Sequence, residues 1–117
     1  MEVKRGEVWW VDLPDPVASA PEGTWPVLVV QSNAFNRSAI RTVVVAAITS
    51  NLRLADAPGN VPIGAKEAGL SRPSVVNVSQ LLTLDRSFLR SRSGRLKPAT
   101  LEAVDRGLHL ILSLAER

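Results

Sequence analysis

The chain has 117 residues, of which 45% are hydrophobic and 21% charged, a balance that predicts one globular domain over residues 1–117 and excludes a disordered chain. Its net charge of +3 mildly favours a polyanionic partner. Cysteine is absent and His109 is the only histidine, which excludes disulfides, a thiol nucleophile and zinc bound by cysteine.

Runs of β-branched residues predict a mainly β fold through residue 84. The expected strands cover residues 8–13, 27–31, 42–48, 60–63, 74–78 and 80–84. Residues 27–31 and 42–48 are almost continuously apolar, as expected of central strands buried on both faces in a closed small barrel. Pro62 cannot donate a ladder hydrogen bond, so we expect its strand at an edge. The connections 14–26 and 49–59 have the length at which loops often carry function.

The remaining third of the chain predicts a basic segment and one helix. Residues 85–88 have the length of a single helical turn, and Pro98 suits the first position of a helix. This helix has an apolar stripe at helical spacing: Leu101, Val104, Leu108, Ile111 and Leu112. The segment before it carries cations with no acid among them: Arg86, Arg90, Arg92, Arg95 and Lys97. Two interpretations of this basic segment stay open, contact with nucleic acid and a solvated basic surface.

No segment has the pattern of a targeting sequence, a membrane span or a cofactor site. The first ten residues include four charged side chains and no apolar run approaches membrane-spanning length, so we expect a cytoplasmic protein without membrane contact. The glycines are scattered singly, which disfavours a phosphate-binding loop and a nucleotide cofactor. Since the acidic residues form no obvious carboxylate cluster, we expect no metal site and no cofactor.

Hydroxyl side chains follow the predicted strand 42–48. Cleavage of RNA without a metal requires the ribose 2′-hydroxyl to attack the adjacent phosphate with the help of a proton shuttle and a positive charge. Thr49 and Ser50 offer hydroxyls where this strand meets a loop, a place where functional side chains are common. The same pair also ends strands for structural reasons, so both interpretations stay open.

Several sequence blocks carry a family resemblance that covers nearly the whole chain. They are Arg5-Gly6-Glu7-Val8-Trp9, Asp12-Leu13, Pro26-Val27-Leu28-Val29-Val30, Phe35-Asn36, Val43-Val44-Val45-Ala46-Ala47-Ile48-Thr49-Ser50 and Gly69-Leu70. In order and spacing they resemble the MazF/PemK family of toxin endoribonucleases. The resemblance implies an SH3-like small barrel of the plasmid-maintenance toxin type with a C-terminal helix, and sequence-specific, metal-independent cleavage of single-stranded mRNA. It also implies a homodimer and a type II antitoxin partner whose acidic, disordered C-terminal segment occupies the RNA groove.

Carried over by position, the resemblance assigns the family's catalytic threonine to Thr49, with Ser50 beside it. The family's catalytic arginine, the residue before the Pro-Val-Leu-Val strand, falls on Trp25, whose indole has neither the charge nor the donor fork of a guanidinium. A charged pair that some members use falls on Asn77 and Ser79. Loops 18–25 and 50–57 are expected to shape access for RNA. The candidate RNA-binding residues are Thr24, Trp25, Arg41, Arg53, Arg72, Asn77 and Gln80.

Several explanations of Trp25 stay open. An arginine of another loop, Arg41, Arg53 or Arg72, reaches the phosphate; or Trp25 stacks a base in a slower enzyme; or the protein binds without cutting. A structural alternative is a ring that packs against residues 14–21. The corresponding alternatives for the whole protein are a non-catalytic module that holds RNA or an antitoxin, and a CcdB-like inhibitor of a protein target such as DNA gyrase. The blocks around Trp9 and Thr49 favour the MazF-like enzyme.

Overall fold

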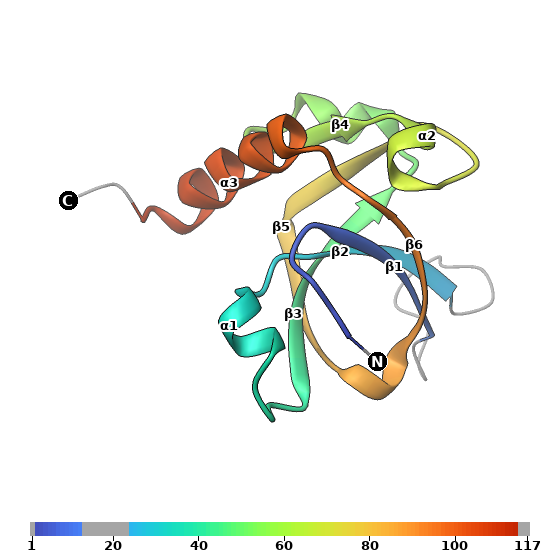
Figure 1. Ribbon diagram of the computed structural model, residues 1–117. Coiled ribbons are helices and arrows are strands. Elements are labelled where there is room, and N and C mark those ends of the chain that lie inside the picture. Colours follow the sequence, from blue (N-terminus) through green and yellow to red (C-terminus); the bar gives the residue numbers. More distant parts are fainter. Residues whose placement is uncertain (1, 13–23, 115–117) are drawn as a thin grey trace.

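The computed structural model describes residues 2–12 and 24–114, in which one curled antiparallel sheet packs against a C-terminal helix (Figure 1). The strands are β1 (Glu7–Asp12), β2 (Thr24–Val29), β3 (Thr42–Thr49), β4 (Val61–Ile63), β5 (Ser74–Asp85) and β6 (Leu89–Arg95). The helices are α1 (Asn33–Asn36), α2 (Ala65–Ala68) and α3 (Pro98–Leu112), with 3-10 helices at Leu52–Asp56 and Arg86–Phe88. Most of the expected loop 14–26 lies outside the described residues. None of the described helices has the length and apolar character needed to cross a bilayer.

The mainly β fold with a C-terminal helix is confirmed, although the sheet is curled and open where a closed barrel was expected. Its strand order is β4-β5-β3-β2-β1-β6, so β4 and β6 are edges and do not pair with each other. The edge position of β4 agrees with the expectation from Pro62. The result is a half-barrel whose curl is visible in Figure 1.

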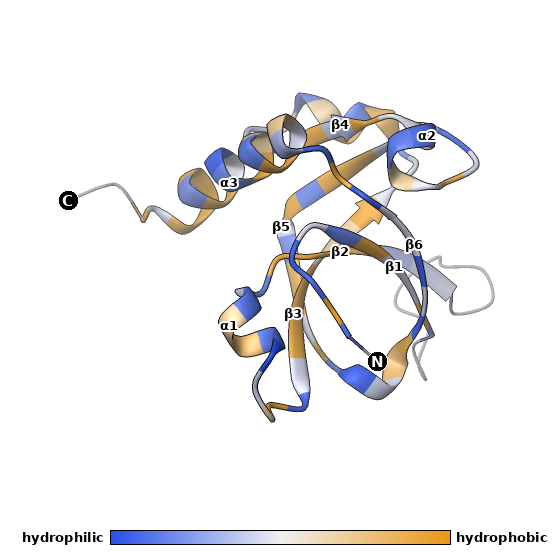
Figure 2. Ribbon diagram, in the orientation of Figure 1, coloured by the Kyte–Doolittle hydropathy of each residue, from blue (hydrophilic) through white to orange (hydrophobic). Residues whose placement is uncertain are grey.

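Two apolar clusters form the core, and alternate residues of the central strands enter different clusters, as the two-residue period of a strand requires. The inner cluster, within the curl of the sheet, contains Val3, Trp9, Val11, Val27, Val29, Val43, Val45, Leu84 and Leu89. The helix-side cluster contains Val8, Leu28, Ala46, Ile48, Val61, Ile63, Ala68, Val76, Val78, Leu96, Val104 and Leu108. Figure 2 shows the corresponding hydrophobic colouring along β3 and β5. The expectation that β2 and β3 are buried on both faces is therefore confirmed.

Strand β5 is one continuous element where two pieces separated by Ser79 were expected. Its pairing with β3 jumps from Asn77 opposite Ala47 to Leu81 opposite Ala46, which leaves a bulge of Val78, Ser79 and Gln80. The backbone N–H of Val78 donates to Asn60 Oδ1 at 2.9 Å, so the side chain of a neighbouring segment satisfies the bulged backbone. The bulge explains why the hydrophobic alternation of the sequence is interrupted at this point.

Strand β6 was not predicted. Only Leu89 of its seven residues is buried, and its serines, arginines and glycine carry little β propensity. It forms because β1 provides a hydrogen-bonded neighbour from the far end of the chain. Charged side chains suit such an edge strand, since they oppose pairing with another chain.

Helix α3 begins at Pro98 as predicted, but only the first part of its apolar stripe is packed. Val104 and Leu108 are buried in the helix-side cluster, and Leu101 packs against it. Ile111 and Leu112 are 45% and 50% exposed. The expected stripe is wrong at its end because the helix extends past the sheet, as Figure 1 shows.

Candidate active site

A pocket of about 450 Å³ lies where β2 begins and β3 ends, close to the turn after α2. It is lined by Trp10, Thr24, Trp25, Pro26, Ala47, Ile48, Thr49, Ser50, Leu54, Leu70, Ser71, Arg72, Ser74 and Gln80. The pocket therefore brings together six of the sequence-derived candidates: Thr24, Trp25, Thr49, Ser50, Arg72 and Gln80. Its volume is in the range of sites that hold small ligands.

Thr49 is the last residue of β3 and is partly buried, whereas Ser50 is exposed. The Thr49 hydroxyl accepts a hydrogen bond from the Asn51 N–H at 3.1 Å, and the Asn51 side chain accepts one from the Arg53 N–H at 3.2 Å. These contacts begin the 3-10 helix and fix the position of the Thr49 hydroxyl. A hydroxyl that accepts in this way still has its own proton to donate into the pocket.

Trp25 lies opposite Val11 in the β1–β2 ladder, and its side chain packs against the inner cluster. The pairing of β2 with β3 ends at Val27 opposite Ala47, two residues short of Trp25 and Thr49, which both line the pocket. Its indole Nε1 is buried and has no hydrogen-bond partner among the described residues. Trp25 thus combines a packed ring with an unused donor at the edge of the pocket.

The three arginines proposed to replace the family's arginine are placed very differently. Arg72, in the turn after α2, is the only Lys or Arg among the residues that line the pocket in the described part of the chain. The Ser74 hydroxyl donates to the Arg72 carbonyl at 3.2 Å, which steadies the backbone of this turn. Arg53 is exposed on the 3-10 helix and does not line the pocket.

Arg41 lies before the start of β3, whereas Thr49 lies at its end. At about 3.3 Å per strand residue these two positions are on the order of 25 Å apart, too far for an arginine side chain to span. The Arg41 guanidinium instead lies 3.5 Å from the Asp85 carboxylate and is 77% exposed. The pKa of Asp85 is held below its usual range, mainly by hydrogen bonds from Ser87. The nearby Arg41 lowers the pKa further.

The bulge of β5 separates two of the other candidates. Asn77 does not line the pocket, and its side-chain oxygen accepts hydrogen bonds from the Ser79 N–H at 3.2 Å and the Ser79 hydroxyl at 2.7 Å. Gln80, at the end of the bulge, does line it. A bulge commonly redirects a side chain in this way beside a functional site.

The basic segment before α3 is less free than its sequence implies. Arg90 pairs with Asp12 at 2.8 Å and Arg92 with Glu7 at 3.0 Å, both acids coming from β1. Arg86 donates to the backbone carbonyl of Asn36 at 2.9 Å and so anchors α1. Three of its five cations are therefore engaged by residues far away in the sequence, which limits what this segment can offer to nucleic acid.

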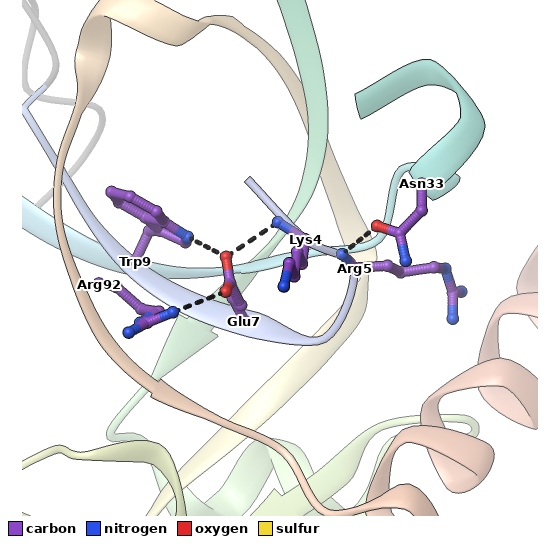
Figure 3. Close-up of polar contacts among 6 residues, drawn as sticks. All are labelled: Lys4, Arg5, Glu7, Trp9, Asn33 and Arg92. Carbon is purple, nitrogen blue, oxygen red and sulfur yellow. Dashed lines mark hydrogen bonds and ion pairs between the residues drawn. The ribbon is translucent and has the colours of Figure 1, made fainter. Parts of the chain in front are cut away.

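Glu7 is the centre of a polar network at the start of β1 (Figure 3). Its side chain is 1% exposed, and it accepts hydrogen bonds from the Lys4 N–H at 2.9 Å, the Trp9 indole at 3.0 Å and the Arg92 guanidinium at 3.0 Å. Burial raises the pKa of Glu7, but the hydrogen bonds from Lys4, Trp9 and Arg92 outweigh it and hold the pKa below the usual range. This buried carboxylate is structural and lies outside the pocket lining.

The pocket is also lined by residues that were not predicted for the site: Trp10, Leu54, Ser71 and Ser74. A signal existed for Trp10: two adjacent tryptophans in a strand must point to opposite faces. The described residues contain no group of three or more histidines, aspartates or glutamates that could hold a metal ion.

Comparisons with known proteins converge on one family. A family model described as the PemK-like, MazF-like toxin of type II toxin-antitoxin systems matches residues 4–112. A curated relative named Endoribonuclease MazF6, from Mycobacterium tuberculosis, is 44% identical over 114 residues, covering 97% of this chain and 100% of the relative. Endoribonuclease EndoA from Bacillus subtilis is 38% identical and covers 99% of both chains.

The solved structures agree with these sequence relatives. A mycobacterial endoribonuclease in complex with its cognate antitoxin superposes with a TM-score of 0.77 at 30% identity, covering 94% of each chain. A second structure, an endoribonuclease from Mycobacterial species, gives a TM-score of 0.77 at 27% identity, covering 97% of this chain and 93% of the other.

Proposed function

Because the chain belongs to the PemK-like, MazF-like toxins of type II toxin-antitoxin systems, we propose that it is an endoribonuclease that cleaves single-stranded mRNA within short sequence motifs. The observation that carries this proposal is the pocket that Thr49 and Arg72 both line. The relatives named endoribonucleases support it and do not favour the non-cutting or CcdB-like alternatives. We propose the cytoplasm as the place where the protein meets this mRNA.

In the proposed reaction the ribose 2′-oxygen forms a bond to phosphorus while the bond from phosphorus to the 5′-oxygen breaks. The 2′-hydroxyl loses a proton and the 5′-oxygen gains one, which leaves a 2′,3′-cyclic phosphate and a 5′-hydroxyl. Thr49 donates its hydroxyl proton in a hydrogen bond to a non-bridging phosphate oxygen. Arg72 neutralises the additional charge of the pentavalent transition state.

Trp25 makes this a slower enzyme than one with arginine at that position. Its indole offers one neutral donor and no charge, whereas a guanidinium offers several donors with a full positive charge. Losing a cationic contact of this kind costs roughly a hundred- to a thousandfold in rate, by analogy with a lost oxyanion donor. Arg72 recovers part of that loss because it reaches the same phosphate from the turn after α2.

The test is incubation of purified protein with a long RNA in the presence of a chelator. Discrete fragments that end in cyclic phosphate are expected, and Thr49→Ala and Arg72→Ala should each cleave about a hundredfold or more slowly. Arg106→Ala, which removes an exposed arginine on α3 outside the pocket, serves as the matched control and should cleave like the wild type. Intact RNA at every concentration of wild-type protein would refute the enzyme.

The same proposal includes a homodimer and an antitoxin partner. A related endoribonuclease was solved with its cognate antitoxin, and an acidic segment would suit a groove that contains Arg72. An acidic peptide taken from the antitoxin should compete with RNA for the wild type and lose affinity for Arg72→Ala. A peptide that binds without displacing RNA would contradict a shared groove.

A further inference from the structure

Trp10 is a large side chain that lies outside the apolar core of the described residues. It is partly buried and belongs to neither of the two apolar clusters of the described residues. Its neighbour Trp9 behaves in the opposite way, since it is 5% exposed in the inner cluster and donates its indole N–H to Glu7. Adjacent strand residues point to opposite faces, so the fold uses Trp9 as core and turns Trp10 toward the pocket.

The described neighbours of Trp10 in the sheet are small, which is consistent with its being only partly buried. Across the ladders Trp10 lies opposite Pro26 of β2 and Ser91 of β6, both of which are short side chains. Neither is large enough to cover an indole face. A large aromatic side chain that remains open to a polar-rimmed pocket is typical of a binding platform.

Trp25 is less suited to this role, although it lines the same pocket. Its ring is packed against the inner cluster, where it lies opposite the fully buried Val11. Trp10 is therefore the aromatic side chain that the described pocket leaves to a ligand. In the same pocket, Ser71 and Gln80 provide hydrogen-bonding groups of the kind that read the edge of a base.

We propose that Trp10 stacks one unpaired base of the bound RNA beside the phosphate held by Thr49 and Arg72. The choice of RNA as the ligand rests on the proposed function. The new element is Trp10 as the base-stacking residue, a role for which the sequence offered only Trp25. Sequence-specific proteins commonly recognise single-stranded RNA by stacking a splayed base on an aromatic ring. The pocket volume of about 450 Å³ suits one such nucleotide.

The test measures binding separately from cleavage. The probes are short 2′-O-methyl oligonucleotides of A, C, G or U, whose blocked 2′-oxygen prevents cleavage, and a matching chain of abasic 2′-O-methyl ribose phosphates. Loss of the stacking contact in Trp10→Ala should raise Kd for the tightest base-carrying probe about ten- to a hundredfold. Trp10→Phe should restore most of that affinity, because a phenyl ring also stacks.

The abasic chain distinguishes stacking from a merely structural role. If Trp10 stacks a base, Trp10→Ala binds the abasic chain as the wild type does; if Trp10 only supports the pocket, both probes lose affinity together. Phe35→Ala is the matched control, since it removes a 56% exposed aromatic ring outside the pocket and should leave both values of Kd unchanged.

Each outcome decides one of the two proposals. Wild-type cleavage with undiminished base binding by Trp10→Ala overturns the stacking role and leaves the enzyme intact. Binding without cleavage by the wild type overturns the enzyme, while the dependence on Trp10 still decides the stacking role. Failure of the wild type to bind any of the four base-carrying probes also overturns the stacking role.

Discussion

Trp25 contributes to the packing of the pocket but supplies no charge for its chemistry. At this position the family pattern implies arginine, and the chain has a ring that packs against the inner cluster while its indole nitrogen has no partner among the described residues. The Trp25 ring therefore stabilises the fold, and its indole is neutral. The cation of the proposed reaction therefore has to come from a different element, and Arg72 is the arginine that lines the pocket.

Trp25→Arg should raise the single-turnover rate of RNA cleavage about tenfold or more, because it adds a charged donor to the pocket that Thr49 lines. The relative gain should be larger in an Arg72→Ala background, where no other pocket arginine remains. Trp25→Met controls for loss of the ring without gain of charge, and melting temperatures control for lost packing. An equal relative gain in both backgrounds would contradict the view that Arg72 and an arginine at position 25 serve the same phosphate.

Glu7 is the residue whose charge state should matter most for stability. Its pKa in the folded protein is below the ordinary 4.5, so the ionised form stabilises the fold at neutral pH, and this contribution is lost as pH falls through the lowered pKa. Glu7→Gln should lower the free energy of unfolding by about 1–3 kcal/mol at neutral pH. In acid, where Glu7 of the wild type becomes protonated, the two free energies of unfolding should approach each other. Urea titrations across this range measure both effects. The exposed Glu2→Gln should change neither, and a constant deficit at all pH values would contradict the role of the charge.

At the scale of elements, sequence reasoning succeeded where a strand depends on its own residues. The β-branched segments of β2 and β3 predict central strands because their burial on both faces requires continuous apolar side chains. Strand β6 was not predicted, because it forms by hydrogen bonding to β1, which is distant in the sequence. The bulge in β5 depends likewise on Asn60, which no local pattern connects to Val78.

The candidate site divides in the same way. Thr49 was a candidate from its place at the end of an apolar strand and from the family resemblance, and it lines the pocket. The choice among Arg41, Arg53 and Arg72 depends on which loop folds back toward that strand end, and this information is tertiary. Trp10 was missed although alternation within β1 predicts that one of two adjacent tryptophans leaves the core.

The turn that carries Arg72 depends on how α2 ends. Gly69 has a φ of 71°, and a Cβ atom there would collide with the backbone of Ser93 on β6. Gly69→Ala should therefore lower the free energy of unfolding by about 1–3 kcal/mol and slow RNA cleavage by displacing Arg72. Gly64→Ala is the matched control, because nothing lies within 4 Å of the added methyl group and its φ is ordinary. Equal stability of the two variants by urea denaturation would contradict this view of the turn.

At the scale of the whole molecule, four arginines of the described residues are engaged in ion pairs within the chain. Arg5 pairs with Asp105 at 2.7 Å and donates to the Val30 carbonyl at 2.8 Å, which ties the start of β1 to α3 and to the end of β2. Arg90 and Arg92 pair with acids of β1. Binding of RNA should accordingly depend on a few phosphate contacts together with stacking, and not on a broad basic surface.

The dependence of RNA affinity on salt measures this balance directly. Each neutralised phosphate of a single strand contributes about −0.7 to the slope of log K against log salt concentration, while stacking contributes almost nothing to it. Arg72→Ala should make the slope shallower by about 0.7, because it removes one phosphate contact. Trp10→Ala should weaken binding at every salt concentration and leave the slope unchanged. Arg106→Ala removes a charge outside the pocket and should change neither the affinity nor the slope. If the slope became shallower by the same amount for Arg72→Ala and Arg106→Ala, RNA binding would depend on the net charge of the molecule and not on the pocket arginine.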